Sequence, residues 1–147
     1  EVKNLKGFAI FFNMLKFDNK FFDENFFLYF EESDYCLRAI KKNYQINNIK
    51  VIHNVGTSVI LKDEDEKKKL EKLCTWHFIW SKFYYYRKHY SIIYNLIYFF
   101  PIFLRIVFRI FFYTITKNQS KREKFLIRYD GLMCSVKGLK SFKRIEN

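Results

Sequence analysis

The stretch FFDENFFLYFEESDYCLRAIKKN, residues 21–43, carries the clearest structural pattern of the chain. Its first ten residues are dense in Phe and are interrupted by Asp23 and Asn25, which predicts a loop ending in an aromatic-packed turn. Acidic side chains open the second part and basic ones follow, the order of charges that the helix macrodipole favours. A helix is therefore predicted to begin near Glu31.

Two short apolar segments flank this stretch. Residues 7–12, GFAIFF, form an apolar run, and residues 44–54, YQINNIKVIHN, are rich in Ile and Val. Short apolar runs of this composition are typical of buried β-strands. We therefore expect one strand over residues 7–12 and a second over 45–53, on either side of the predicted helix.

The second part of the chain reads as helical. Residues 62–73, KDEDEKKKLEKL, predict the start of a solvated helix, because Glu and Lys recur at helical spacing. The pattern continues into the aromatic segment CTWHFIWSKFYYYRKHY, residues 74–90. Residues 92–116 are the most apolar stretch, and a further helix is expected near 120–140.

Composition limits the class of protein. The chain has 147 residues, 50% of them hydrophobic and 22% aromatic, with four Gly and one Pro, which excludes a disordered, collagenous or low-complexity chain. The net charge of +12 is concentrated after residue 60, where 19 basic and 8 acidic side chains lie. An AT-rich genome would produce a similar excess of Lys, Asn, Ile, Phe and Tyr, so charge and aromatics alone indicate little. Three widely spaced cysteines fit a reducing compartment.

Three acidic side chains follow the aromatic segment FFLYF directly. Glu31, Glu32 and Asp34 lie within four residues, where mutual repulsion and apolar neighbours raise the pKa of at least one carboxyl, as a general base requires. A structural alternative is the first turn of a helix stabilised by its dipole, with Asp34 and Arg38 as an i,i+4 pair. Chemistry alone favours this alternative, because acids are common in first helical turns.

A resemblance covers residues 5–58. The runs GFAIFFNMLKF (7–17), FFDENFFLYFEESDYCLRAIKKNYQI (21–46) and VIHNVGTS (51–58) together resemble the acceptor-side half of family 2 glycosyltransferases, especially bacterial rhamnosyltransferase-like enzymes. WSKFYYYRKHY (80–90) is similar to the aromatic and basic segment that often follows in them. The resemblance implies an α/β fold class: residues 1–60 as the carboxy-terminal part of a GT-A (Rossmann-like) catalytic domain, and residues 61–147 as a basic, mostly helical extension. The nucleotide-binding half, with its Asp-x-Asp metal motif, is expected to precede Glu1, and the isolated chain is expected to be inactive.

The resemblance also implies roles for single residues. Glu32, with Glu31 beside it, would be the base that deprotonates the acceptor, although the family usually has Asp at the second position. Asp34 and Arg38 would orient the loop and helix or contact the acceptor. His53 would help to hold the divalent metal, Mg²⁺ or Mn²⁺, that binds the nucleotide diphosphate. The implied reaction is inverting transfer of a sugar from a nucleotide-sugar donor to a cell-surface polysaccharide or lipid-linked glycan.

The apolar segment 92–116 is long enough to span a bilayer. Asn95, Pro101, Arg105 and Arg109 argue against a span, since an Arg at the centre of a bilayer is costly. We expect an amphipathic helix lying peripherally on the cytoplasmic face of the inner (plasma) membrane, with Arg105 and Arg109 on one face contacting anionic lipid. The alternative is a helical hairpin that buries its aromatics against the catalytic domain.

Two functions of other classes compete with the enzyme. The first is a non-catalytic, membrane-associated interaction protein that retains a transferase-like surface. The second is a single-stranded nucleic-acid-binding module that uses the aromatic and basic residues 84–88. No recognisable nucleic-acid motif accompanies that segment, so nucleic acid is not an expected partner.

Overall fold

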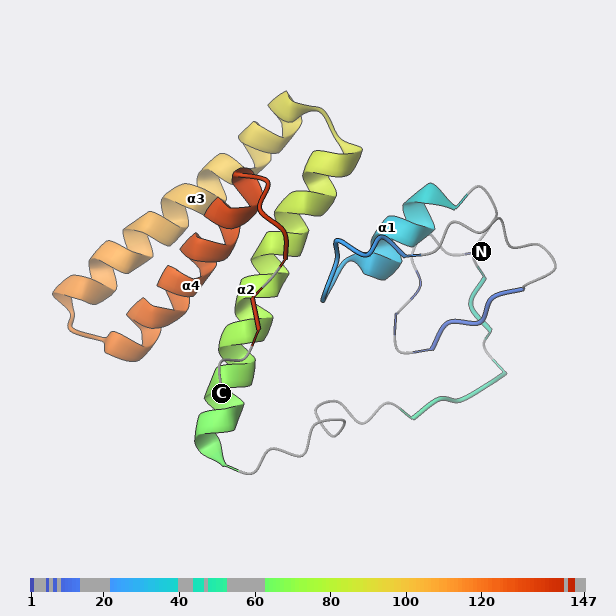
Figure 1. The fold of residues 1–147 in the computed structure, drawn as a ribbon, viewed down its shortest axis with the longest axis horizontal. Coiled ribbons are helices and arrows are strands. Elements are labelled where there is room, and N and C mark those ends of the chain that lie inside the picture. The colour runs from blue at the N-terminus through green and yellow to red at the C-terminus, as the bar shows by residue number, and fades with distance from the viewer. Residues whose placement is uncertain are drawn as a thin grey trace.

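The computed structural model describes residues 1, 5, 7, 9–13, 22–39, 44–46, 48–52, 63–141, 143 and 144. These residues form four helices: α1 (Glu31–Arg38), α2 (Glu64–His89), α3 (Ile92–Ile115) and α4 (Gln119–Val136). In Figure 1, α3 and α4 lie together on one side of α2, and α1 lies on the other. The helix predicted to begin near Glu31 is confirmed, as are those predicted after residue 62 and near 120–140.

The predicted α/β, Rossmann-like fold class is wrong for the described part of the chain, which is all-α. Neither apolar segment forms a strand: residues 9–12 and the described residues of 45–52 have no regular secondary structure. Ile46, Ile49, Val51 and Ile52 are 49–88% exposed, so the described residues of this segment have no buried face. A strand persists only when neighbouring backbone pairs with it, and a local preference for β structure does not supply that pairing.

Local side-chain caps fix where the long helices begin. Asp63 precedes α2, and its carboxylate accepts hydrogen bonds from the backbone N–H groups of Asp65 and Glu66 at 3.0 and 2.8 Å. Ser91 caps α3 and Asn118 caps α4 in the same way. Each cap satisfies backbone donors that have no partner inside the helix. The two-residue connection from α2 to α3 makes these helices an antiparallel hairpin.

The core lies where α2, α3 and α4 meet. Its buried residues are Ile79, Phe83, Phe99, Ile106 and Leu132. Gly131 lets α4 approach α2 closely, because a Cβ atom at this position would lie 2.7 Å from the Trp76 carbonyl oxygen. One turn on, Ser135 is buried and donates to the Trp80 carbonyl oxygen at 3.0 Å. Small residues thus set the spacing of this pair of helices.

Replacing Gly131 with Ala should destabilise the fold by about 1–3 kcal/mol, the usual cost of overpacking a core. An added Cβ would also lie 2.8 Å from Ile79 Cγ2, so a backbone must shift. In an exposed helix the change from Gly to Ala is stabilising. A loss of stability at Gly131 would therefore indicate that α4 lies too close to α2 for a Cβ atom. Urea unfolding followed by circular dichroism measures it. Lys124→Ala, exposed on the same helix, is the control and should change stability by less than about 0.5 kcal/mol.

The chain after α4 returns along α2. Trp80 Nε1 donates to the Leu139 carbonyl oxygen at 3.0 Å, and His77 Nε2 lies 2.9 Å from the Lys143 carbonyl oxygen. The guanidinium of Arg144 lies 3.8 Å from the ring centre of Phe27. Burial is the largest effect on His77 and lowers its pKa. The hydrogen bond with the Lys143 carbonyl raises the pKa by less than burial lowers it, and the charge of Arg144 lowers it further. The tail therefore joins α2 to the aromatic segment that precedes α1.

Candidate functional site

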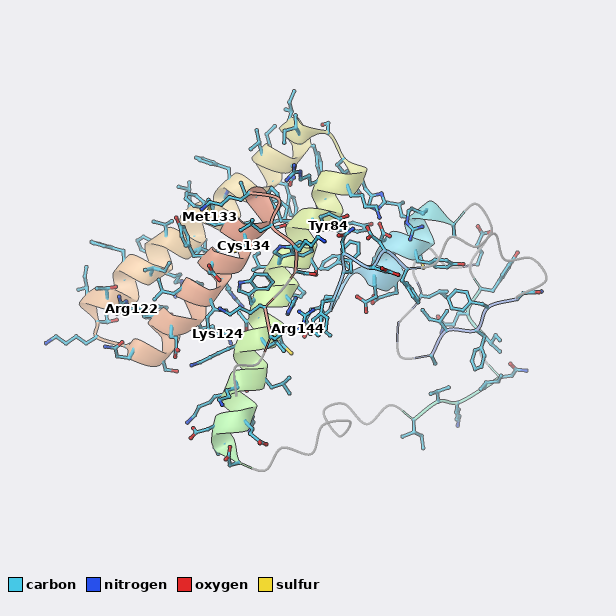
Figure 2. All side chains as sticks on the ribbon, in the orientation of Figure 1. Tyr84, Arg122, Lys124, Met133, Cys134 and Arg144 are labelled. Atoms are coloured by element: carbon cyan, nitrogen blue, oxygen red, sulfur yellow. The ribbon has the colours of Figure 1, made fainter. Side chains whose placement is uncertain are left out.

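The aromatic segment at residues 26–30 docks on one face of α2. Phe26 packs edge-on against Tyr84 at a ring-centre distance of 4.9 Å, and Figure 2 shows Tyr84 on the side of α2 toward α1. Phe30 contacts two further rings of α2, those of Phe78 and Tyr85. Ser81 is fully buried, and its hydroxyl donates to the Leu28 carbonyl oxygen at 2.7 Å. The start of α1 is thereby fixed on α2.

The backbone is strained immediately before the carboxylates. Tyr29 and Phe30 both adopt left-handed conformations, with φ of 68° and 70°. Such a conformation costs a non-glycine residue of order 1–3 kcal/mol and persists only where the surroundings enforce it. Phe30 is also the N-cap residue of α1, and it provides no side-chain cap. Strain of this kind concentrates at functional sites, and here it directs the chain into Glu31 and Glu32.

Glu31 and Glu32 are half-buried in the first turn of α1. In the described part of the chain, the Oε2 atom of each is buried and has no hydrogen-bond partner. Burial raises the pKa of Glu31, and the charge of Glu32 raises it further. Gly7 borders the pair, because a Cβ atom there would lie 3.5 Å from Glu32 Cδ. A carboxylate with one buried oxygen that lacks a hydrogen-bond donor, in a partly apolar site, has the properties of a proton acceptor.

Tyr29 lies beside Glu31 and contacts Cys74, and neither residue was predicted from the sequence to belong to the site. Burial, a hydrogen bond with Cys74 and the charge of Glu31 raise the pKa of Tyr29 to about 12. The phenol therefore stays protonated at neutral pH. In the sequence, only the position of Tyr29, two residues before Glu31, indicated that it could lie near the carboxylates. Cys74 comes from α2, and only the fold brings it here.

Asp34 is fully buried and is held by three nitrogen donors, two of them on the cationic side chains of Arg38 and Lys88. Its carboxylate accepts hydrogen bonds from Arg38 Nε, Lys88 Nζ and His89 Nε2, each at 2.7 Å. Burial alone would raise its pKa, but the hydrogen bonds from Lys88, Arg38 and His89 outweigh burial and lower it. The predicted i,i+4 pair of Asp34 and Arg38 is confirmed. Lys88 and His89 end α2, so Asp34 joins α1 to α2.

Asp23 extends this cluster to the aromatic loop. Lys88 Nζ donates to Asp23 Oδ2 at 2.7 Å, and the Tyr84 hydroxyl donates to the same oxygen at 3.0 Å. Burial opposes ionisation, but hydrogen bonds from Lys88, Asn25 and Tyr84 lower the pKa of Asp23 to about 2. Lys88 thus bridges two carboxylates. The sequence of segment 80–90 predicted an aromatic and basic stretch, but it did not predict that Lys88 and His89 bind the acidic cluster.

The fold should lose stability in acid because of this cluster. The pKa values of Asp23 and Asp34 are lower in the folded state than in the unfolded chain, so their stabilisation is complete above the ordinary Asp pKa near 4 and is lost below it. We expect the melting temperature to fall steeply from pH 4 toward pH 2. Thermal unfolding at half-unit pH steps measures this. Asp23→Asn should flatten the slope, and an unchanged slope would contradict the role of Asp23.

The metal site implied by the resemblance is not formed by the described residues. Among them, no three His, Cys, Asp or Glu side chains gather to hold a metal ion. The three carboxylates of α1 do not form such a group, because Asp34 is occupied by its cationic partners. His53 lies outside the described residues.

Helix α3 is long and apolar enough to cross a membrane, and only 11% of its most apolar window is buried. Asn95, Phe99, Ile106 and Tyr113 face the bundle and are buried. The outward face is apolar over its whole length; its exposed residues are Ile93, Ile97, Phe100, Leu104, Phe108, Phe111 and Ile115. Arg105 is exposed, and Arg109 Nη1 donates to the Tyr113 hydroxyl at 3.0 Å.

Four tyrosines form a stacked ladder at the connection between α2 and α3. The rings of Tyr86 and Tyr98 stack with centres 4.5 Å apart, and those of Tyr90 and Tyr94 lie 5.1 Å apart. Lys82 places its ammonium 5.1 Å from the ring centre of Tyr98. Tyr90 and Tyr94 are each more than 40% exposed. This tyrosine ladder has an apolar body and polar hydroxyls, the chemistry that favours a membrane–water interface.

Comparison of the chain with protein-family models, with curated proteins and with solved structures finds no match.

Proposed function

We propose that this chain is part of a glycosyltransferase that transfers a sugar from a nucleotide-sugar donor to a cell-surface polysaccharide or lipid-linked glycan. The observation that carries the proposal is the Glu31–Glu32 pair, with one buried and unpartnered oxygen on each side chain. Acids in a first helical turn stabilise the helix through its dipole, and solvent-exposed carboxylates do this as well as buried ones. The dipole therefore does not explain why these two carboxylates are partly buried. Burial raises the pKa of Glu31, which supports proton transfer at this pair.

Glu32 acts as the base in this proposal. As the acceptor hydroxyl oxygen attacks the anomeric carbon, its proton passes to the Glu32 carboxylate. The new carbon–oxygen bond forms while the bond from the anomeric carbon to the diphosphate breaks, and the configuration inverts. Glu31 lies beside Glu32, and burial and the charge of Glu32 raise the pKa of Glu31. Asp34 does not touch the substrate; it positions α1 through its hydrogen bonds with Arg38, Lys88 and His89.

The test is an assay of the protein as its own cells make it. Affinity-tagged protein, isolated from source-cell membranes, is incubated with radiolabelled nucleotide sugars and a lipid extract of the same cells. The proposal expects label from at least one donor to enter the glycan or lipid fraction. If no donor labels either fraction while the protein is folded, the glycosyltransferase proposal is wrong.

The same proposal places α3 peripherally on the cytoplasmic face of the plasma membrane. Its apolar outward face supports burial among acyl chains, and the tyrosine ladder supports a position at the headgroups. Arg105 and Arg109 lie four residues apart, so they share one flank of the helix. From that flank both can reach anionic lipid.

Replacing Arg105 and Arg109 with Glu should release the protein from anionic vesicles. Each basic residue near such a surface contributes about 1 kcal/mol, so two charge reversals should weaken binding by roughly 100-fold or more at low salt. Co-sedimentation with phosphatidylglycerol vesicles measures it. Lys67→Glu with Lys68→Glu, an exposed pair near the start of α2, is the charge-matched control and should have a much smaller effect. Equal losses in the two variants would contradict the placement of α3.

A further inference from the structure

The three long helices leave an apolar groove of about 830 Å³ between them. Phe83 of α2, Leu96, Phe100 and Phe103 of α3, and Met133 and Val136 of α4 line it, and Figure 2 labels Met133 on α4. Its volume is in the range of sites that hold small molecules. All the lining residues are apolar except Arg87.

The groove opens on the outward face of α3. Leu96, Ile97 and Phe100 both line the groove and are 60–70% exposed. The apolar surface of the groove is therefore continuous with the surface proposed to lie against acyl chains. A hydrocarbon chain could enter the groove from the membrane without crossing water, and burial of these apolar side chains against it would favour binding.

Arg87 gives the groove one charged end. Its Nη1 atom donates two long hydrogen bonds to the carbonyl oxygens of Ser135 and Val136, at 3.5 and 3.4 Å. Within the part of the chain that the structure describes, no carboxylate pairs with Arg87, and its Nε and Nη2 have no hydrogen-bond partner. These free donors can bind phosphate oxygens in the planar geometry that guanidinium favours.

We propose that this groove binds one acyl chain of an anionic phospholipid, with the lipid phosphate at Arg87. The charged end and the apolar length match a molecule with one phosphate and a long hydrocarbon chain. The opening toward the outward face of α3 matches a ligand that arrives from a bilayer. This site is separate from the Glu31–Glu32 pair, and it depends on the proposed membrane placement, not on sugar transfer.

The test measures binding of lysophosphatidylglycerol to the full chain below its critical micelle concentration. Lysophosphatidylcholine with the same acyl chain is the matched neutral probe. Native mass spectrometry gives the stoichiometry, and titration calorimetry gives the affinity. We expect each chain to bind one molecule of lysophosphatidylglycerol. The affinity for lysophosphatidylcholine should be at least tenfold weaker than the affinity for lysophosphatidylglycerol. Arg87→Gln should reduce the difference between the two lipids to less than twofold.

Two matched variants separate the groove from general adsorption. Leu96→Trp fills the groove, and Leu104→Trp places the same ring on the same exposed helix outside it. Leu96→Trp should weaken binding at least tenfold, and Leu104→Trp less than twofold. Equal effects of the two variants, or no bound lipid, would overturn the proposal. A chain that is dimeric without lipid and becomes monomeric only with Leu96→Trp would also overturn it, because a second copy would then occupy the groove.

Discussion

Replacing Asp34 with Ala should destabilise the chain by about 3–5 kcal/mol, the usual cost of removing one member of a buried ionic cluster. Asp34 is fully buried, and Arg38, Lys88 and His89 donate to it at 2.7 Å. Without the carboxylate, His89 would lose this hydrogen-bond acceptor and Lys88 would keep only Asp23, so the contact between α1 and α2 would weaken. Urea unfolding at pH 7, followed by circular dichroism, measures the change.

The control is a carboxylate of the same kind at the surface. Glu123 pairs with Lys72, and both side chains are about half exposed. Glu123→Ala should therefore cost no more than about 1 kcal/mol. If the two variants lose similar stability, Asp34 does not hold α1 on α2. Asp34→Asn, which keeps the size of the side chain but removes its charge, should fall between Asp34→Ala and the wild type.

Replacing Glu32 with Gln should lower turnover by roughly 10²–10⁴-fold, the range that general-base catalysis contributes. The Oε2 atom of Glu32 has no hydrogen-bond partner among the described residues, so an amide should fit with little loss of stability. Donor binding should change little, because in the proposed mechanism Glu32 only accepts the proton of the acceptor hydroxyl and does not bind the donor. Steady-state rates of sugar transfer and equilibrium binding of the donor separate the two effects.

Further variants locate the base within the pair. Glu32→Asp keeps the carboxylate and should restore much of the rate lost in Glu32→Gln. Glu24→Gln, an exposed acid in the aromatic loop, should leave turnover unchanged. A larger loss with Glu31→Gln than with Glu32→Gln would move the role of base to Glu31. Undiminished turnover in both Gln variants would instead favour a non-catalytic, membrane-associated interaction protein.

The helices were predictable because their signals are local. Acids at 31–34 and 63–66 precede basic residues along the chain, and Asp63 caps its own helix within three residues. The strand predictions at 7–12 and 45–53 failed because strand formation depends on pairing with distant backbone, which no short apolar run encodes. The fold class that the resemblance implied rested on those same segments, and it is wrong for the described residues.

The candidate site was predictable only in part, for the same physical reason. Glu31, Glu32, Asp34 and Arg38 lie within eight residues, and the i,i+4 spacing alone predicts the contact between Asp34 and Arg38. His89 lies 55 residues from Asp34 in sequence, and docking of the aromatic segment on α2 brings them together. The left-handed turn at Tyr29 and Phe30 is likewise imposed by tertiary packing.

The last residues of α2 bind Asp34, and the next residue, Tyr90, belongs to the tyrosine ladder. Because α1 spans only eight residues, or about 12 Å, the carboxylates lie within a short reach of that ladder. On the proposed placement, an acceptor anchored in the same membrane diffuses in two dimensions and meets Glu32 at a local concentration set by the length of its tether. A soluble sugar dilutes into the whole cytoplasm. Location alone would then select anchored acceptors over free ones, without a single specific contact.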